Sequence, residues 1–349
     1  MDLSVGIVRD PVYLEHKTGL SHPEDPGRLT SVYAMLDQRF SGRFLNLEPT
    51  PASLEQIEMV HSPAYVQLVL STARRAFTNL TSDTPVSARS CHTAWLAAGG
   101  VLRGLEALMT GQCAMCFALV RPPGHHALPG QAGGFCIFNN LSIAARWARR
   151  AFGLKRILIV DWDVHHGNGI QDVFYREREV FYMSSHYFQA YPHTGDWEDV
   201  GLGAGAGYTL NLCLPGDATD DDVLHLYREI LPQVVEGFDP QLIMVAAGYD
   251  AHKDDPLGNT HLTEMAFAGL GALVRRLGPE RGIPLLLALE GGYSHEALTA
   301  SLAQTLLALL DPAQGQEILA LADSFRGRAL ANKARQVHGP YGVWMGGMM

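Results

Sequence analysis

The chain has 349 residues, of which 47% are hydrophobic, enough to bury the core of one large domain or two modest ones. Its formal net charge of −10 argues against a nucleic-acid-binding surface, because phosphate binders need clustered Lys and Arg. The N-terminus has no secretory signal core, and no apolar run reaches the roughly 20 residues of a membrane-spanning helix. Composition therefore predicts a cytoplasmic protein with neither nucleic-acid nor membrane partners.

Five cysteines, an odd number without a disulfide spacing pattern, are typical of a reducing compartment. Cys113 and Cys116 form a C-x-x-C, but the motif runs into a predicted strand and no second Cys/His pair accompanies it. We expect both to be buried structural residues. Cys136 is expected beside the site described below, whose chemistry does not require it.

No Pro-, Gly- or Ser-rich linker divides the chain and no repeat occurs at solenoid spacing, so a single domain is predicted over residues 1–349. Gly237 is expected just beyond the end of a helix that closes at Val235. Apolar runs and helical patterns alternate along the chain. In order they predict a helix at 28–39, a helix at 92–109, a strand at 115–120, a helix at 139–150, a strand at 157–160, a strand at 180–183, a helix at 220–235, a strand at 242–247, a helix at 263–277, a strand at 285–289 and a helix at 295–310. This alternation predicts an α/β fold with a mostly parallel sheet covered by helices on both faces.

Polar residues are concentrated directly after the apolar strand at 157–160. Two carboxylates and two imidazoles follow it, those of Asp161, Asp163, His165 and His166. Because Asp163 and His165 lie two positions apart on an extended backbone, their side chains point the same way and can share one metal ion. Asp161 is left free to orient a neighbour. Ligands of parallel sheets bind beyond the carboxyl ends of the strands, so a site is predicted here.

Further polar motifs follow other apolar runs. Residues 121–126 read RPPGHH, 133–136 read GGFC, 255–258 read DPLG and 290–293 read EGGY. In this order along nearly the whole chain, the motifs resemble the histone deacetylase family, which has the arginase/deacetylase fold. The resemblance is to the class II-like bacterial deacetylase and acetylpolyamine amidohydrolase group. It covers about residues 4–310 and leaves 311–349 as a C-terminal extension without an assigned role.

The resemblance implies a catalytic metal centre whose ligands are Asp163, His165 and Asp255; the neighbouring Asp254 is disfavoured by the Asp-Pro-Leu-Gly match. Zn²⁺ is the expected metal, with one coordination position left open for water. Two carboxylates and one imidazole form a hard ligand set, so Fe²⁺ or Co²⁺ is an open alternative. The family also implies a structural K⁺ nearby, held by oxygen atoms of Asp161, Asp163, His165, Ser184 and Ser185.

The resemblance also implies the catalytic roles. His126 would act as general base and then general acid, with His125 as its electrostatic partner. Asp161 would orient His125, whereas the amide of Asn168 would orient His126 without adding negative charge and leave it the less basic of the two. Tyr293 would donate to the developing oxyanion. The implied reaction is metal-dependent removal of an acetyl or other acyl group from an N-acyl-lysine side chain or a similar N-acyl alkylamine.

A narrow tunnel for a linear substrate is implied by residues that match the channel of similar enzymes, namely Gly134, Phe135 and Tyr191. Asp83 resembles the rim aspartate that holds a peptide backbone. The polyamine-selective branch carries an acidic residue where this chain has Leu257, which favours acyl-lysine. An acid elsewhere on the rim, such as Asp83 or Glu15, keeps acetylpolyamine hydrolysis as the alternative.

Two rival functions share this fold or pocket. A non-catalytic acyl-amine sensor is opposed by the intact His125, His126 and Tyr293. A binuclear manganese ureohydrolase is opposed by the lack of a second Asp after His165 to bridge a metal pair.

Arg28 resembles an internal-channel arginine of the family but fits a surface helix start equally well. The sequence leaves the physiological substrate and a homo-oligomeric state open.

Overall fold

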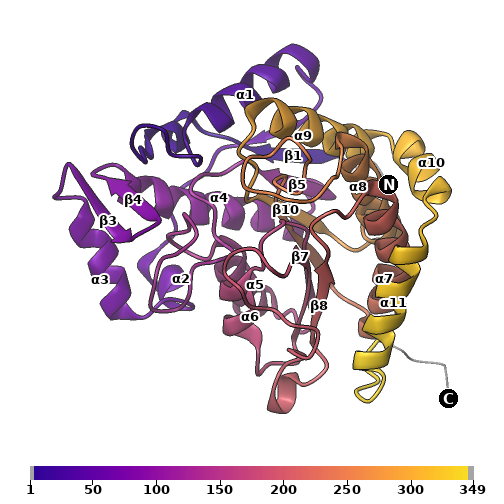
Figure 1. Cartoon of the computed structure of the whole chain (residues 1–349). Coiled ribbons are helices and arrows are strands. Elements are labelled where there is room, and N and C mark those ends of the chain that lie inside the picture. The colour runs from indigo at the N-terminus through magenta and orange to yellow at the C-terminus, as the bar shows by residue number, and fades with distance from the viewer. Residues whose placement is uncertain (1–3, 345–349) are drawn as a thin grey trace.

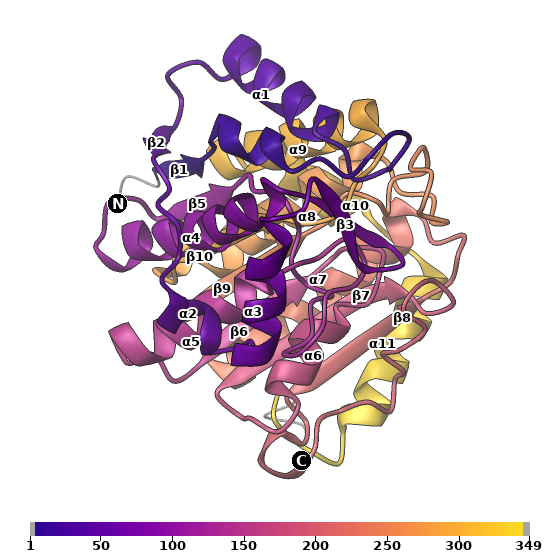
Figure 2. The ribbon, with the colours of Figure 1, turned by 90° about the vertical axis from the view of Figure 1, so that its left-hand side faces the viewer.

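The computed structural model describes residues 4–344 and arranges them around an eight-stranded sheet (Figure 1). The strand order is β2-β1-β5-β10-β9-β6-β7-β8, every neighbouring pair is parallel, and the strand labels of Figure 2 follow this order. These strands are β1 (Val5–Val8), β2 (Leu45–Leu47), β5 (Met115–Ala118), β6 (Ile157–Asp161), β7 (Val180–Tyr187), β8 (Thr209–Leu214), β9 (Leu242–Ala247) and β10 (Leu285–Leu289). A separate antiparallel hairpin is formed by β3 (Phe77–Thr81) and β4 (Thr84–Ser87).

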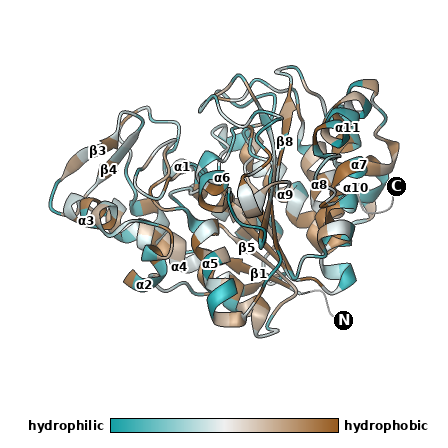
Figure 3. Ribbon diagram, turned by 90° about the horizontal axis from the view of Figure 1, so that it is seen from below, coloured by the Kyte–Doolittle hydropathy of each residue, from teal (hydrophilic) through white to brown (hydrophobic). Residues whose placement is uncertain are grey.

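Helices cover both faces of the sheet, with α2 to α5 on one side and α7 to α11 on the other (Figure 3). They are α1 (Gly27–Arg39), α2 (Leu54–Glu58), α3 (Pro63–Thr72), α4 (Ser90–Met109), α5 (Asn140–Phe152), α6 (Asn168–Phe174), α7 (Asp220–Phe238), α8 (Glu264–Leu277), α9 (His295–Leu310), α10 (Ala313–Leu321) and α11 (Phe325–His338). Short 3-10 turns occupy Pro11–Glu15, Gly203–Gly205 and Pro279–Arg281. Between residues 4 and 344, none of the helices combines the length and apolar character that crossing a bilayer requires.

The central strands explain why the sequence folds this way. Strands β5, β10, β9 and β6 are buried along their whole length, which requires apolar side chains on both faces and produces the unbroken apolar runs of the sequence. Parallel neighbours need a long crossover, which the intervening helices supply. The predicted α/β fold with a parallel, doubly covered sheet is confirmed.

The C-terminal part beyond residue 310 continues the helical layer. Helix α10 packs against α8, and α11 packs against α7 (Figure 1). Gly237 does not end a helix, because α7 runs through it to Phe238. A Cβ at Gly237 would lie 2.6 Å from the backbone of Trp344, whose side chain is buried. The glycine therefore allows the end of the described chain to dock on α7.

Candidate active site

Four adjacent strands at the centre of the sheet, β5, β10, β9 and β6, end at the same edge. The loops that follow them are residues 119–126, 290–293, 248–250 and 162–167. All four loops are largely buried although they carry His, Asp and Glu side chains. Buried ionisable groups are costly unless they are paired or bind a ligand, so this edge is the candidate site.

Asp163, His165 and Asp250 form a buried group that could hold a metal ion; we call it the metal group. Each residue offers one ligand atom, and these atoms lie within 4.8 Å of one another. His165 Nδ1 lies 3.2 Å from Asp163 Oδ1 and 3.0 Å from Asp250 Oδ2. Backbone N–H groups hold both carboxylates, because Gly291 donates to Asp163 over 2.8 Å and Val164 donates to Asp250 over 2.9 Å.

The metal group favours a positive charge between its carboxylates. Burial alone would lower the pKa of His165, but Asp250 and Asp163 outweigh it and raise that pKa to about 10. Burial and the nearby Asp163 raise the pKa of Asp250 to about 7. Metal ligands bind in their deprotonated forms, so a divalent cation would take the place of these protons. The donor set fits a metal ion in its chemistry as well as in its spacing.

Asp250 is the third member of the metal group by spacing, whereas Asp255, the metal ligand expected from the sequence motif, lies in the next loop and stays a prediction. Oδ2 of Asp255 accepts hydrogen bonds from the backbone N–H groups of residues 293–294, over 2.6 and 3.2 Å. Its Oδ1 accepts one from the N–H of Leu257 over 3.0 Å. These bonds hold Asp255 between two loops of the site, and because each carboxylate oxygen has two lone pairs, they leave it able to bind a metal ion as well.

His125 and His126 lie next to the metal group with their rings 4.0 Å apart. The Nδ1–H of His125 donates to Asp161 Oδ2 over 3.1 Å, and the same oxygen accepts from the Tyr182 hydroxyl over 2.9 Å. The Nδ1–H of His126 donates to Asn168 Oδ1 over 2.8 Å. Both pairings expected from the sequence are present, and each leaves the Nε2 of its imidazole available.

The two imidazoles have opposite electrostatic surroundings. Burial opposes protonation of His125, but the carboxylates of Asp163 and Asp161 raise its pKa to about 10. Burial, together with the neighbouring His125 and His165, lowers the pKa of His126 well below its usual value. A neutral His126 beside a cationic His125 can accept a proton at a position where negative charge is also stabilised.

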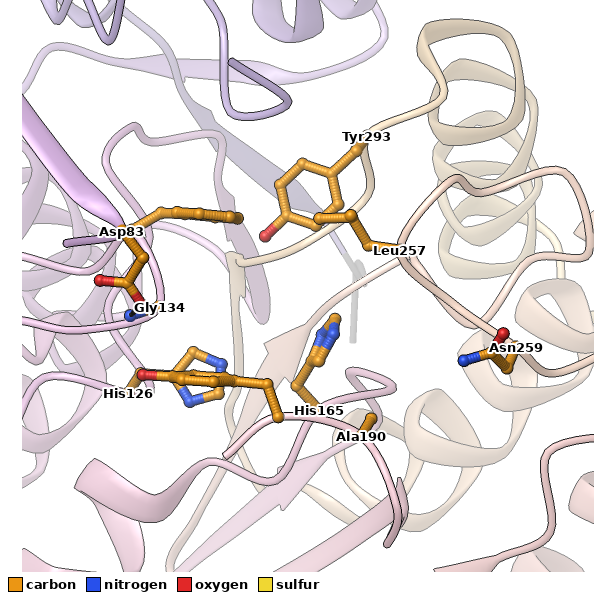
Figure 4. Close-up of a pocket in the computed structure, with 10 residues that line it drawn as sticks. Asp83, His126, Gly134, His165, Ala190, Leu257, Asn259 and Tyr293 are labelled. Carbon is orange, nitrogen blue, oxygen red and sulfur yellow. Dashed lines mark hydrogen bonds between the residues drawn. The ribbon is translucent and has the colours of Figure 1, made fainter. Parts of the chain in front are cut away.

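A pocket of about 380 Å³ opens onto these groups (Figure 4). In Figure 4 the hydroxyl of Tyr293 points into the pocket, with His126 and His165 across from it. All five residues expected to line a substrate tunnel line this pocket. Its lining residues are Asp83, His126, Gly134, Phe135, His165, Ala190, Tyr191, Leu257, Asn259 and Tyr293.

Phe135 and Tyr293 form an aromatic wall, with their rings edge to face at 5.6 Å. The guanidinium carbon of Arg28 lies 4.9 Å from the centre of the Tyr293 ring, and Arg28 is fully buried. This excludes the surface position considered for Arg28. Gly134 has a φ of +53°, and a Cβ there would lie 2.2 Å from Cδ2 of His126, so the loop can approach the imidazole only as glycine.

Besides the histidines and tyrosines, the polar side chains on the pocket wall are Asp83 and Asn259, on opposite sides in Figure 4. Asp83 lies between β3 and β4, where its Oδ2 accepts from the N–H of Gly134 over 3.0 Å. Hydroxyl groups of Thr81 and Thr84 donate to its Oδ1 over 2.6 and 2.9 Å. These bonds hold a carboxylate at the pocket. Glu15, the other acid considered for the rim, pairs instead with Arg89.

Residues expected around a monovalent cation gather at the ends of β6 and β7. Asp161 and Ser184 are opposite each other in the parallel ladder. The hydroxyl of Ser185 is 2.7 Å from that of Tyr227. Asp163 and His165 follow on the β6 side, and all five expected residues are buried.

Sequence reasoning missed three residues of the site. Asp250 follows the apolar run of β9, so the strand-end argument used for Asp163 would have found it. Glu290 accepts hydrogen bonds through Oε2 from the N–H groups of Gly124 and His125, over 2.6 and 3.1 Å. No sequence pattern pointed to that contact or to Asn259.

Comparison with known proteins identifies the family. The histone deacetylase domain matches residues 22–309. A probable deacetylase of Archaeoglobus fulgidus is 38% identical over 297 residues, covering 83% of this chain and 82% of the relative. The human polyamine deacetylase HDAC10 is 40% identical over 305 residues, which cover 83% of this chain but 45% of that protein.

A solved structure agrees with these sequence matches. The crystal structure of the HDA15 HD domain superposes with a TM-score of 0.89 at 32% identity, covering 98% of this chain and 96% of that one. Both the fold and the sequence therefore match over the region that contains the site. The chain belongs to the histone deacetylase family, and it is a hydrolytic deacetylase.

Proposed function

We propose that the protein is a zinc-dependent amidohydrolase that removes an acetyl group from an N-acyl-lysine side chain or a similar N-acyl alkylamine. One observation carries the proposal. His126, His165 and Tyr293 line the same pocket, so a base, a member of the metal group and a phenol face one substrate position. These are the parts that amide hydrolysis needs.

Asp163, His165 and Asp255 would hold Zn²⁺, with Asp250 beside His165; when bound, the ion supplies a Lewis acid and lowers the pKa of a coordinated water. His126 would take the proton of the attacking water at Nε2 and deliver it to the leaving amine. His125, kept cationic by Asp161, would stabilise the negative charge that develops nearby. The hydroxyl of Tyr293 would donate a hydrogen bond to the substrate oxygen that becomes the oxyanion. The ligand set would also accept Fe²⁺ or Co²⁺.

The pocket wall supports the proposed substrate class. Phe135, Tyr191 and Leu257 are apolar or aromatic, and such a lining suits a linear aliphatic stem with an uncharged amide at its end. Acetylpolyamine is the second candidate, favoured by the carboxylate of Asp83, which could pair with a free amine. The relative named polyamine deacetylase is consistent with this candidate.

Two further assignments accompany the proposal. The oxygen atoms of Asp161, Asp163, His165, Ser184 and Ser185 would hold a structural K⁺ behind the metal group. A cytoplasmic location is proposed because all five cysteines are unpaired, as in a reducing compartment.

The test compares kcat/KM for acetate release from an acetyl-lysine peptide and from acetylputrescine, with zinc-loaded protein. Tyr293→Phe should lower kcat about 100-fold on the preferred substrate, with a smaller change in KM, because the hydroxyl acts on the developing oxyanion. Preference for the peptide supports the acyl-lysine assignment, and preference for acetylputrescine supports Asp83 as an amine-binding group. Equal rates for wild type and Tyr293→Phe on both substrates would refute the mechanism.

A further inference from the structure

A second group of potential metal ligands includes one histidine of the catalytic pair. His125, Cys136 and Glu290 each offer one ligand atom, and these atoms lie within 4.8 Å of one another. Their exposed fractions are 3%, 0% and 1%, respectively. None of the three belongs to the metal group.

Each member of this second group keeps one ligand atom without a strong partner. Among residues 4–344, Oε1 of Glu290 is buried and has no hydrogen-bond partner, since Oε2 accepts both backbone N–H bonds. The Sγ of Cys136 makes only a contact of 3.4 Å to the carbonyl oxygen of Gly134. His125 uses Nδ1 for Asp161, and its Nε2 is 3.8 Å from the nearest Asp163 oxygen, beyond hydrogen-bond range.

The chemistry of these atoms differs from that of the metal group. A thiolate, an imidazole and a carboxylate form a softer set than two carboxylates and an imidazole, and soft ligands select thiophilic metals. Bonds of about 2.0–2.3 Å in a tetrahedral zinc site place ligand atoms roughly 3.3–3.8 Å apart. The three ligand atoms lie within 4.8 Å of one another, so a bound cation would have to draw them closer by up to roughly 1 Å.

We propose that His125, Cys136 and Glu290 form a second, inhibitory site for a thiophilic divalent cation such as Zn²⁺ or Cd²⁺. Binding displaces the thiol proton of Cys136 and any protons on His125 and Glu290 to solvent. The cation occupies Nε2 of His125 and adds positive charge beside Asp163. The inhibitory part rests on the proposed function, because it requires His125 to act in the reaction.

The experiment uses Cd²⁺ as the probe on protein first loaded with one equivalent of zinc. The metal group contains no sulfur, so a thiolate-to-cadmium charge-transfer absorption reports only on a site with a cysteine ligand. Wild type should bind a further equivalent of Cd²⁺ with this absorption, and Cys136→Ser should bind it at least about 100-fold more weakly, because loss of a direct ligand exceeds the roughly 10–100-fold effect of an outer-shell partner. Cys113→Ser is the matched control and should behave like wild type.

An absorption that persists in Cys136→Ser and disappears in Cys113→Ser would overturn the proposal, because the C-x-x-C would then be the site. Its absence from wild type would overturn the proposal as well. If Cys136→Ser does not fold, cadmium X-ray absorption on wild type decides: one sulfur neighbour for the added Cd²⁺ supports the site, and none or two refutes it.

Inhibition is measured separately. Excess Zn²⁺ should slow acetate release by wild type and by Cys113→Ser, and much less by Cys136→Ser; equal inhibition of all three would refute the inhibitory role. The charge-transfer absorption requires no turnover. A protein that shows it without Tyr293-dependent release would support the second site while refuting the proposed function.

Discussion

Asp250 and Asp255 have the same side chain and lie a few positions apart, yet the structure gives them different tasks. The sequence predicted Asp163 and His165 from their two-residue spacing, which is a local property of an extended backbone. The third ligand comes from another strand, and its choice depends on which carboxylate faces the pair across the sheet edge. That information is tertiary: the motif predicts Asp255, while the structure places Asp250 next to His165 and gives Asp255 hydrogen bonds to two loops.

Exchanging each aspartate for asparagine decides which of the two binds the metal. Asp255→Asn should weaken zinc binding by at least about 100-fold, since the ligand expected from the motif is lost. Asp250→Asn should weaken zinc binding less, by roughly 10–100-fold at most, as for a group that acts through a neighbouring histidine. Metal content after dialysis checks the pair. Normal metal content in Asp255→Asn, with loss in Asp250→Asn, would contradict the motif-based assignment.

The helices and strands that were predicted from the sequence are the most deeply buried ones. Every strand and helix expected between residues 28 and 310 is present, because burial on both faces requires long apolar runs. Elements at the periphery were missed. Strand β1 is short and interrupted by Gly6, β2 is largely exposed, and β8 alternates polar and apolar residues next to its single neighbour β7. Such segments have weak patterns, because they are short or contain Gly, Thr and Asn rather than an unbroken apolar run.

The docking of the chain end on α7 can be tested at Gly237. In an isolated helix, alanine would be more stable than glycine by up to about 1 kcal/mol. Here the added Cβ would overlap the backbone of Trp344, so Gly237→Ala should lower the thermal unfolding temperature and shift tryptophan fluorescence to the red. In a chain ending after His338, which lacks Trp344, Gly237→Ala should raise the unfolding temperature. A higher unfolding temperature for Gly237→Ala in the full chain would show that Trp344 does not pack on this helix.

A buried ionic network connects the N-terminal segment to two of the sequence motifs of the site. Glu24 pairs with Arg121 and, over 2.9 Å, with Arg28, and all three side chains are inaccessible to solvent. Arg28 also donates to the carbonyl oxygens of Glu290 and Gly292, each over 2.6 Å. The network joins the N-terminal segment to the loops after β5 and β10, and each charge is paired, as burial requires.

This network predicts acid sensitivity. Burial lowers the pKa of His16, which lies beside Glu24, from 6.5 to about 3. Burial alone would raise the pKa of Glu24, but Arg121 lowers it from 4.5 to about 2. Both pKa values are lower in the folded protein than in the unfolded chain, so each group contributes its full stabilisation only above its unfolded pKa. As the pH falls, the contribution of His16 is lost below 6.5 and that of Glu24 below 4.5.

His16→Gln isolates the first step. Near pH 5 the unfolded chain gains about 2 kcal/mol from protonating His16, whereas the folded chain does not take up this proton. The difference in unfolding free energy between about pH 7.5 and pH 5 should therefore be smaller in His16→Gln by that amount. Chemical denaturation at the two pH values measures it. An identical pH dependence in wild type and variant would mean that His16 is protonated in the folded protein.

The strand order also has a consequence for biosynthesis. Strands β10 and β9 lie between β5 and β6, so residues 242–289 must be inserted between two half-sheets made earlier in the chain. A ribosome adding about 5–20 residues per second needs on the order of ten seconds to pass from the end of β6 to the end of β10. During that interval β5 and β6 each present an unpaired, apolar edge. The nascent chain is therefore exposed to aggregation until its last third emerges, and the catalytic centre is among the last parts to assemble.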